Sequence, residues 1–294
     1  MAQMRVGLVG TGPWAELAHG PGLVAAPSVD LVGVWGRSLE RAEALAERLG
    51  VTAYDDYAAL LADVEAVAFA VPPAVQGEMA LLAARAGRHL LLDKPVAIDV
   101  GAARLLRDTA AGAGLASVVF FTDRFVDETR AWIAEVHDDE GWRGGWVRWF
   151  SALQEPDNPF GASPWRHEAG ALWDTGPHAL SIMMATLGPI TSLTAVAGAG
   201  DEVHLVVRHG TGQTSSITLS QFAPPAAAIH ETTLWGDAGL TTMPPIPDGA
   251  IVALLARAAE ELVHSAATGE PHELDLHFGT RVVELLAMAQ DQLR

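Results

Sequence analysis

The sequence contains no cysteine and only one lysine among its 294 residues. The absence of cysteine excludes disulfides, a thiolate nucleophile and cysteine-ligated zinc, and we expect a cytoplasmic protein. The 18 basic residues are 17 arginines and Lys94. Arginine stays protonated in proteins, whereas the lysine ammonium is compact and can exchange a proton. The single lysine therefore reflects either a compositional bias or a site that requires an ammonium.

Basic residues are also scarce beside the 36 acidic ones, so the formal net charge is −18. This charge argues against nucleic acid as a partner. No apolar run approaches the about 18 residues that a membrane helix needs, and residues 1–5 do not resemble the start of a secretory signal, so we expect no membrane association. Half of the residues are hydrophobic, which is enough for a packed core in one large or two ordinary domains.

Short apolar runs alternate with amphipathic stretches through the first 121 residues. Runs of this kind are typical of parallel strands that are buried on both faces. We expect strands at 6–9, 31–35, 66–71, 89–93 and 117–121, and helices at 39–49 and 75–86. The pattern predicts an α/β fold, with a doubly wound parallel Rossmann sheet over residues 1–121.

The pattern changes after residue 121, where strands follow one another with few helices between them. We expect strands at 146–153, 193–197, 203–209, 214–220 and 231–235. Helical spacing of apolar residues occurs at 127–136, 177–187, 251–267 and 274–293. Residues 122–294 are therefore predicted to form a second, α+β domain with an open, mainly antiparallel sheet.

A glycine-rich turn directly follows the first expected strand and opens a helical stretch. Its residues are Gly10, Thr11, Gly12, Pro13, Trp14 and Ala15. In such a turn the first glycine allows a tight bend, the second lets a pyrophosphate approach the backbone, and the small third residue allows close helix packing. The phosphate then lies at the helix N-terminus. The context of strand, turn and helix predicts a dinucleotide site.

The end of the second strand bears on the choice between NAD and NADP. An NAD site places a carboxylate there to bind the ribose 2′-hydroxyl, but this chain has Gly36, Arg37 and Ser38. A cation and a hydroxyl suit a 2′-phosphate, so we predict NADP, with NAD as the alternative. A second interpretation is that Ser38 only caps the next helix while Arg37 points to solvent.

Two further clusters carry candidate catalytic groups. Asp93 and Lys94 follow the strand at 89–93, at the sheet edge where ligands of doubly wound folds bind. Asp174 precedes Pro177 and His178 at the start of an expected helix. The positive end of a helix disfavours imidazolium, so His178 is expected to be neutral and able to accept a proton.

Taken together, these motifs resemble those of the Gfo/Idh/MocA oxidoreductase family. The matching segments are the glycine turn at 10–15, the proline pair with Val71, Pro72 and Pro73, the Asp93-Lys94-Pro95 motif, and the Asp174 to His178 motif. The resemblance implies a Rossmann domain and a substrate-binding domain that often forms a homo-oligomer, here a dimer or tetramer. It also implies that the proline pair, Gln76, Asp93 and Lys94 lie at the cofactor.

The same resemblance implies the catalytic roles. His178 takes or returns the hydroxyl proton of a carbinol, Lys94 holds and stabilises its oxygen, and Asp174 positions substrate and base. The substrate class implied is a sugar, polyol or inositol-like compound. Asp93 stands where the family usually has Glu, and Gln76 stands where many members have His; neither departure removes a catalytic group.

Aromatic residues beside the expected cleft suggest carbohydrate contacts. Trp165, Arg166 and His167 are the candidates, because tryptophan stacks on sugar rings and arginine binds hydroxyls. Trp146 and Trp149 fall on opposite faces of their strand, so at least one belongs to the core or to a subunit interface.

Three alternatives remain on sequence alone. The chain can be a non-catalytic dinucleotide sensor, although a sensor needs no proton relay. It can also be an enzyme whose bound cofactor oxidises the substrate transiently to drive elimination or glycoside cleavage. A metal-dependent hydrolase with His167, Asp174 and His178 has no recognised ligand motif to support it, so we predict no metal.

Overall fold

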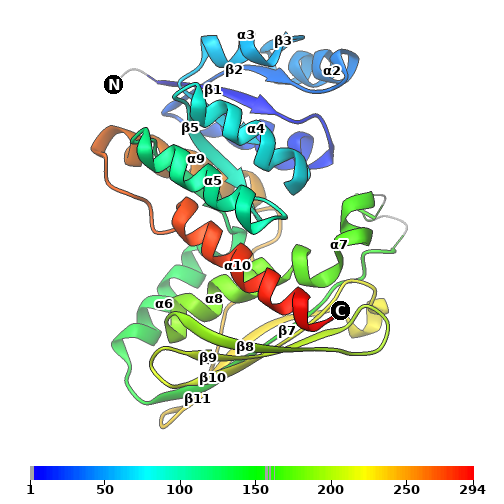
Figure 1. The fold of residues 1–294 in the computed structure, drawn as a ribbon, viewed down its shortest axis with the longest axis vertical. Coiled ribbons are helices and arrows are strands. Elements are labelled where there is room, and N and C mark those ends of the chain that lie inside the picture. Colours follow the sequence, from blue (N-terminus) through cyan, green and yellow to red (C-terminus); the bar gives the residue numbers. More distant parts are fainter. Residues whose placement is uncertain (1–2, 156–157, 159, 162) are drawn as a thin grey trace. The chain divides into compact units, whose positions relative to one another are not determined.

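The computed structural model describes residues 3–155, 158, 160–161 and 163–294. The chain forms two compact units (Figure 1). The first comprises Met1–Phe125 and Asp248–Val283, and the second comprises Val126–Pro247 and Glu284–Arg294. Within the described residues, no helix has both the length and the apolar character needed to cross a membrane.

The first unit contains a parallel sheet with helices on both faces. Its strands, in spatial order, are β3 (Thr52–Tyr54), β2 (Val29–Trp35), β1 (Met4–Val9), β4 (Ala66–Phe69), β5 (His89–Asp93) and β6 (Ser117–Phe120). The connecting helices are α1 (Gly20–Ala25), α2 (Leu39–Leu49), α3 (Tyr57–Asp63), α4 (Pro73–Arg85) and α5 (Val100–Gly112). This strand order defines a Rossmann sheet whose direction of winding reverses between β1 and β4. The predicted doubly wound fold is confirmed.

A π-helix, Ala15–His19, joins the glycine turn to α1. The Gly20 N–H bonds to the Ala15 carbonyl, which is the wider turn of a π-helix. Pro21 follows, and its ring would clash with the carbonyl four residues earlier in a regular α-helix. Because the turn before Pro21 is a π-turn and not a regular α-turn, the helix continues through Gly20, Pro21 and Gly22.

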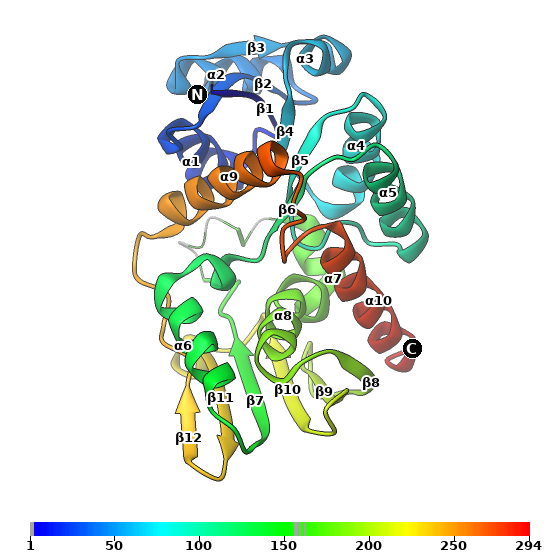
Figure 2. The ribbon, with the colours of Figure 1, turned by 90° about the vertical axis from the view of Figure 1, so that its left-hand side faces the viewer.

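Gly22 lies where α1 contacts α9 (Ile251–Thr268), a helix that is also part of the first unit (Figure 2). A Cβ atom on Gly22 would lie 2.7 Å from Leu255 Cδ2 and 3.1 Å from the Val252 carbonyl oxygen. Glycine thus sets how closely the two helices approach.

We expect Gly22→Ala to lower the free energy of unfolding by about 1–3 kcal/mol, because the added methyl overpacks this contact. Urea unfolding of the purified protein measures the change. Gly112→Ala is the matched control, since a Cβ on Gly112 meets nothing within 4 Å at the end of α5. Equal stability of the Gly22→Ala protein and the wild type would contradict the packing argument.

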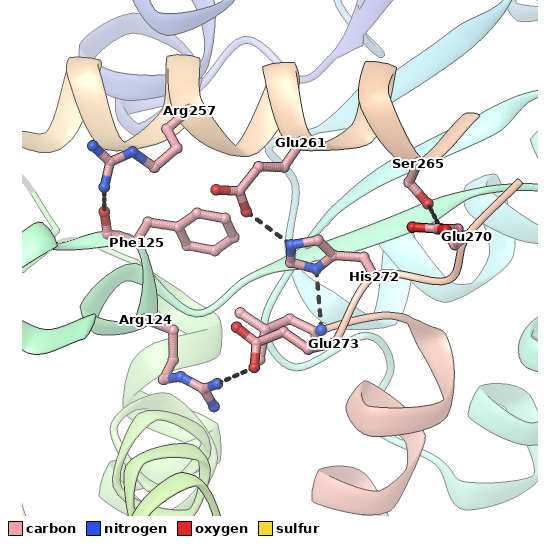
Figure 3. Close-up of polar contacts among 9 residues, drawn as sticks. Arg124, Phe125, Arg257, Glu261, Ser265, Glu270, His272 and Glu273 are labelled. Atoms are coloured by element: carbon pink, nitrogen blue, oxygen red, sulfur yellow. Dashed lines mark hydrogen bonds and ion pairs between the residues drawn. The ribbon is translucent and has the colours of Figure 1, made fainter. Parts of the chain in front are cut away.

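Hydrogen bonds tie α9 and the segment after it to the first unit (Figure 3). Arg257 Nη1 donates to the Phe125 carbonyl at 2.7 Å, and Arg124 Nη2 lies 2.7 Å from Glu273 Oε2. His272 Nε2 lies 2.8 Å from Glu261 Oε2, while its Nδ1 accepts the Leu274 N–H at 3.0 Å. The sequence placed residues 122–294 in one domain, whereas the structure groups 248–283 with the Rossmann sheet, and the contacts of Arg257 and Arg124 are two of the long-range links.

The second unit contains a mixed sheet. Its strands, in spatial order, are β12 (Gly239–Thr242), β11 (Ile229–Gly236), β7 (Trp142–Phe150), β10 (Thr214–Ser220), β9 (Val203–His209) and β8 (Ile190–Ala197). The pair β7 and β10 is parallel and the others are antiparallel. The predicted, mainly antiparallel sheet is therefore confirmed.

Helices α6 (Asp127–Asp138) and α8 (Gly176–Leu187) lie on one face of this sheet (Figure 1). The strand residues alternate in burial, as in β9, where Val203, Leu205 and Val207 are buried and Val206 is 56% exposed. The boundary between the two units falls inside α10 (Leu276–Gln292). In its last turn, Gln292 bonds to the backbone of β8.

Candidate active site

The glycine turn has the geometry that a pyrophosphate requires. Gly10 has φ +132°, and a Cβ there would lie 2.3 Å from the Ala70 carbonyl oxygen. Only glycine fits here, where the turn after β1 passes close to the end of β4. A Cβ on Gly12 would meet nothing within 4 Å, so the backbone of the turn is open on that side. The turn and the following helix therefore fit a dinucleotide phosphate at the switch point of the sheet.

The loop after β2 and the first turn of α2 carry two cations and a hydroxyl. Arg37 is exposed, and Ser38 caps α2 by accepting the Arg41 N–H at 3.4 Å. A Cβ on Gly36 would lie 2.7 Å from Thr11 Cγ2, so Gly36 packs against the glycine turn. Ser38 therefore takes the capping role, and the same helix N-terminus also suits an anion. Arg41, which was not predicted from the sequence, adds a second guanidinium in the first turn of the helix.

Lys94 lies in the loop that leaves β5. Its N–H donates to Asp93 Oδ1 at 2.7 Å, and Asp93 Oδ2 lies 3.6 Å from Nε2 of the buried His19. No described residue hydrogen-bonds to either ring nitrogen of His19. The Asp93 carboxylate thus accepts a hydrogen bond from the backbone of its own loop, directly before the lysine side chain.

The proline pair begins α4, with Pro72 at the N-cap and Pro73 as the first helical residue. Val71 and Pro72 are half-buried beside the end of β4. Gln76 is buried, and its side-chain amide hydrogen-bonds to the backbone of the Lys94 loop. These amide contacts lie within the protein, so the predicted contact of Gln76 with the cofactor remains a prediction.

In the second unit, the junction of α7 (Pro164–Asp174) and α8 holds a buried carboxylate. Asp174 is 5% exposed, and its Oδ2 accepts hydrogen bonds from Arg166 Nη1 and, at 2.6 Å, from Gln221 Nε2. The guanidinium and the amide together stabilise the charged form of a carboxylate that burial alone would penalise. Arg166, predicted to contact substrate, therefore acts on Asp174 in this structure.

His178 is the third residue of α8 and is 7% exposed. Pro177 occupies the first helical turn, as the sequence predicted. The imidazole packs against Trp149 with ring centroids 5.3 Å apart, and Trp149 stacks on His230 at 3.7 Å. His230 is the cross-strand partner of Trp149 on β11, so the two rings share one face of the sheet.

Trp146 has a different environment from Trp149. Its indole N–H donates to Glu231 Oε1 at 2.7 Å, and this hydrogen bond, aided by Arg148, lowers the pKa of Glu231. The neighbours of the two tryptophans agree with their predicted opposite faces.

The other predicted substrate residues lie on α7. The Arg166 guanidinium lies 5.1 Å from the Trp165 ring centroid. His167 Nε2 lies 2.6 Å from the Gly161 carbonyl oxygen, and its ring stacks on Phe222 at 5.3 Å. Residues 165–167 thus contact their own unit, and a role in substrate binding stays a prediction. Among the described residues, no group of three or more His, Asp or Glu is placed to hold a metal ion.

Four residues near the candidate site were not predicted from the sequence: Gln221, His230, His19 and Arg41. Arg41 could have been found from a local signal, because it lies three residues after Ser38, the N-cap of the same helix. Nothing local marks Gln221 or His230. Gln221 reaches Asp174 across 47 residues of sequence, and His230 meets Trp149 through the pairing of β11 with β7. Lys94 lies in the first unit, and Asp174 and His178 lie in the second.

The Rossmann sheet, the glycine turn at its switch point and the helix-start histidine with a buried carboxylate define a dinucleotide-binding oxidoreductase class. Residues 4–121 match the family model described as oxidoreductase family, NAD-binding Rossmann fold, and residues 143–241 match the GFO/IDH/MocA C-terminal domain. The chain belongs to the Gfo/Idh/MocA oxidoreductase family.

Among curated relatives, the chain is similar to D-glucoside 3-dehydrogenase of Escherichia coli, with 32% identity over 43% of this chain and 37% of the relative. The chain spans 31% and 54% of the length of two other curated relatives that it matches.

Solved structures of much lower sequence identity share the fold. GenD2 from gentamicin A biosynthesis, solved with NAD, has a TM-score of 0.86 at 22% identity and covers 99% of this chain and 94% of its own. The 3-ketoreductase KijD10 from Actinomadura kijaniata, solved with NADP and TDP-benzene, has a TM-score of 0.77 at 20% identity, covering 99% and 98%. The fold is thus found with either dinucleotide.

Proposed function

We propose that this chain is an oxidoreductase that moves hydride between a nicotinamide dinucleotide, with NADP preferred, and a carbinol carbon of a sugar, polyol or inositol-like substrate. The observation that carries the proposal is the buried Asp174 carboxylate, held by Arg166 and Gln221 just before the helix that bears His178. A protein that only senses a dinucleotide has no need of a charged, oriented carboxylate beside a histidine that can accept a proton. The carbohydrate class is supported by the name of the D-glucoside 3-dehydrogenase relative.

The reaction makes two demands on the protein. Oxidation of a carbinol requires a group that removes the hydroxyl proton and a group that stabilises negative charge on the oxygen. When bound, the nicotinamide accepts or returns the hydride. We assign the proton to His178, because the N-terminal turn of α8 disfavours imidazolium. We assign the oxygen to the ammonium of Lys94, and the orientation of substrate and base to Asp174.

The dinucleotide would be held by the first unit. The open backbone at Gly12 and the helix that follows would take the pyrophosphate. Arg37, Arg41 and the N-terminus of α2 capped by Ser38 would take a 2′-phosphate. This is the basis of our preference for NADP.

A substrate screen tests the proposal. Sugars, polyols and inositols are incubated with NADP⁺ or NAD⁺, and the corresponding keto compounds with NADPH or NADH, while absorbance at the nicotinamide band and product mass are both followed. Turnover of at least one of these compounds is expected, and it should be faster with the phosphorylated cofactor. Product formed without net change in the cofactor would instead favour transient oxidation, and dinucleotide binding with no product would favour a sensor.

The double variant Arg37→Ala/Arg41→Ala is expected to raise the KM for NADPH about tenfold or more and to leave the KM for NADH nearly unchanged. A charge-assisted hydrogen bond contributes about 1.5–3 kcal/mol, and each 1.4 kcal/mol corresponds to about tenfold in affinity. The measurement is the ratio of kcat/KM for the two cofactors.

Arg48→Ala is the matched control, because Arg48 lies on the same helix but pairs with Glu16 at 3.0 Å. Its cofactor ratio should equal that of the wild type. A wild-type enzyme that prefers NADH would overturn the assignment of NADP.

We also infer a homo-oligomer, a dimer or tetramer, in the cytoplasm. Val196 and Val206 are 57% and 56% exposed on β8 and β9, and a second copy of the chain would cover them. Light scattering during size-exclusion chromatography measures the mass; a monomer would contradict this inference.

A further inference from the structure

Gln76 is a buried polar residue next to the loop that carries Lys94. It is the fourth residue of α4 and is 1% exposed. A polar side chain buried to this degree needs hydrogen-bond partners, because an unsatisfied amide costs free energy. The partners of Gln76 therefore indicate why a glutamine occupies this position.

Within the described residues, the hydrogen bonds of the Gln76 amide all go to the backbone around Lys94. Nε2 donates to the carbonyl oxygens of Asp93 at 2.8 Å, Pro95 at 3.2 Å and Val96 at 3.3 Å. Oε1 accepts the Asp93 N–H at 2.8 Å. The contacts lie on both sides of Lys94 in the sequence. One side chain thus fixes the backbone immediately before and after Lys94.

The chemistry of this contact selects a primary amide. The loop presents three acceptors and one donor, and a carboxamide has two N–H donors and one carbonyl acceptor. An ionised glutamate has no donor and would face three carbonyl oxygens. A neutral imidazole keeps one donor and one acceptor, so it can satisfy only part of the loop.

We propose that Gln76 is a positioning residue that sets the location of the Lys94 ammonium and does not bind the cofactor through its amide. The link to catalysis rests on the proposed function, in which Lys94 holds the substrate oxygen. The positioning itself rests on the hydrogen bonds to the loop. A displacement of about 1 Å at a reacting group can cost about a hundredfold in rate, so fixing the loop backbone directly affects turnover.

The main variant is Gln76→Met, which keeps the length of the side chain and removes every hydrogen bond to the loop. We expect kcat to fall about 10- to 100-fold while the Kd for NADPH is unchanged. Gln76→His should give an intermediate kcat, because it restores part of the donor and acceptor set. Gln213→Met is the matched control; Gln213 is half-buried and donates to the Trp142 carbonyl at 3.1 Å, in the second unit.

A second readout uses the fact that Lys94 is the only lysine in the sequence. Trinitrobenzenesulfonate is added to the full chain, and the modified peptide containing Lys94 is quantified by mass spectrometry, separately from the N-terminal amine. Loss of the contacts should loosen the loop and speed the labelling of Lys94 severalfold in Gln76→Met, with Gln76→His between it and the wild type. Circular dichroism reports whether each variant is folded, and the histidine variant carries the test if the methionine variant is not.

The kinetic and labelling measurements together distinguish a failure of the positioning role of Gln76 from a failure of the proposed function. Weaker NADPH binding with unchanged labelling of Lys94 would overturn the positioning role and identify Gln76 as a cofactor contact. Unchanged kcat and unchanged labelling would overturn it as well. Faster labelling in the variants, with no turnover of any carbohydrate by the wild type, would support the positioning of Lys94 while the proposed function fails.

Discussion

Lys94→Met is expected to lower kcat/KM by about 10²–10³-fold, because it removes the positive charge that meets the developing negative charge on the substrate oxygen. Loss of a single donor to such an oxygen in other enzymes has effects of this order. NADPH binding should change much less, so the loss should appear mainly in kcat. Steady-state kinetics with a substrate identified in the screen, together with NADPH titration, measure both.

Lys94→Arg provides the sharper comparison. It keeps a positive charge, but the planar guanidinium is larger and cannot exchange a proton as an ammonium does. We expect Lys94→Arg to remain strongly impaired, which would explain why the one lysine stands among 17 arginines. If Lys94→Arg has wild-type activity, a fixed charge is sufficient and the isolated lysine reflects composition alone.

Arg166→Met is expected to destabilise the second unit by about 3 kcal/mol and to abolish most activity. Removing one partner of a buried ion pair leaves an uncompensated charge, which costs about 3–5 kcal/mol. We take the low end because the Arg166 side chain is still 19% exposed and Asp174 keeps the hydrogen bond from Gln221. Urea unfolding gives the change in stability, and kcat/KM gives the change in activity.

A double-mutant cycle separates stability from catalysis at this pair. Asp174→Asn removes the charge, so the double variant Arg166→Met/Asp174→Asn should recover part of the stability lost in Arg166→Met. Activity should stay low in all three variants, because Asp174 is needed to orient substrate and base. Additive losses of stability would show that the two side chains are not coupled and would contradict the role given to Arg166.

The fold followed closely from local sequence patterns. The strand expected at 89–93 is β5, and those expected at 203–209 and 214–220 are β9 and β10, with the same bounds. Periodicity succeeds here because strands buried on two faces and strands buried on one face have distinct patterns. The short edge strands β3 and β12 were not predicted, since three or four residues carry too little periodicity to identify. The helices α3, α5 and α7 were not predicted either. In α5, two of the three buried positions are alanine, which gives a weak apolar pattern.

The candidate site was predictable where chemistry is encoded locally. The glycine turn, the capping Ser38 and the helix start at Pro177 all depend on neighbours within a few residues. The partners of these groups were not predictable. The sequence did not indicate that Arg166 binds Asp174 or that the Gln76 amide binds the loop of Lys94. The expected contacts of Arg166 with substrate and of Gln76 with the cofactor stay predictions.

The sequence by itself determined the Rossmann topology, the family and the identity of Lys94 as an exceptional residue, because each depends on residue type and short spacing. Only the tertiary structure decided that α9 belongs with the Rossmann sheet. Its contacts join residues far apart in the chain, such as the Ser28 N–H and Glu260 Oε1 at 2.7 Å. The tertiary structure alone also decided that the Gln76 side chain hydrogen-bonds to the backbone on both sides of Lys94. An amphipathic helix must bury its apolar face, and a buried amide must form hydrogen bonds. Which residues they contact depends on how distant segments of the chain pack together.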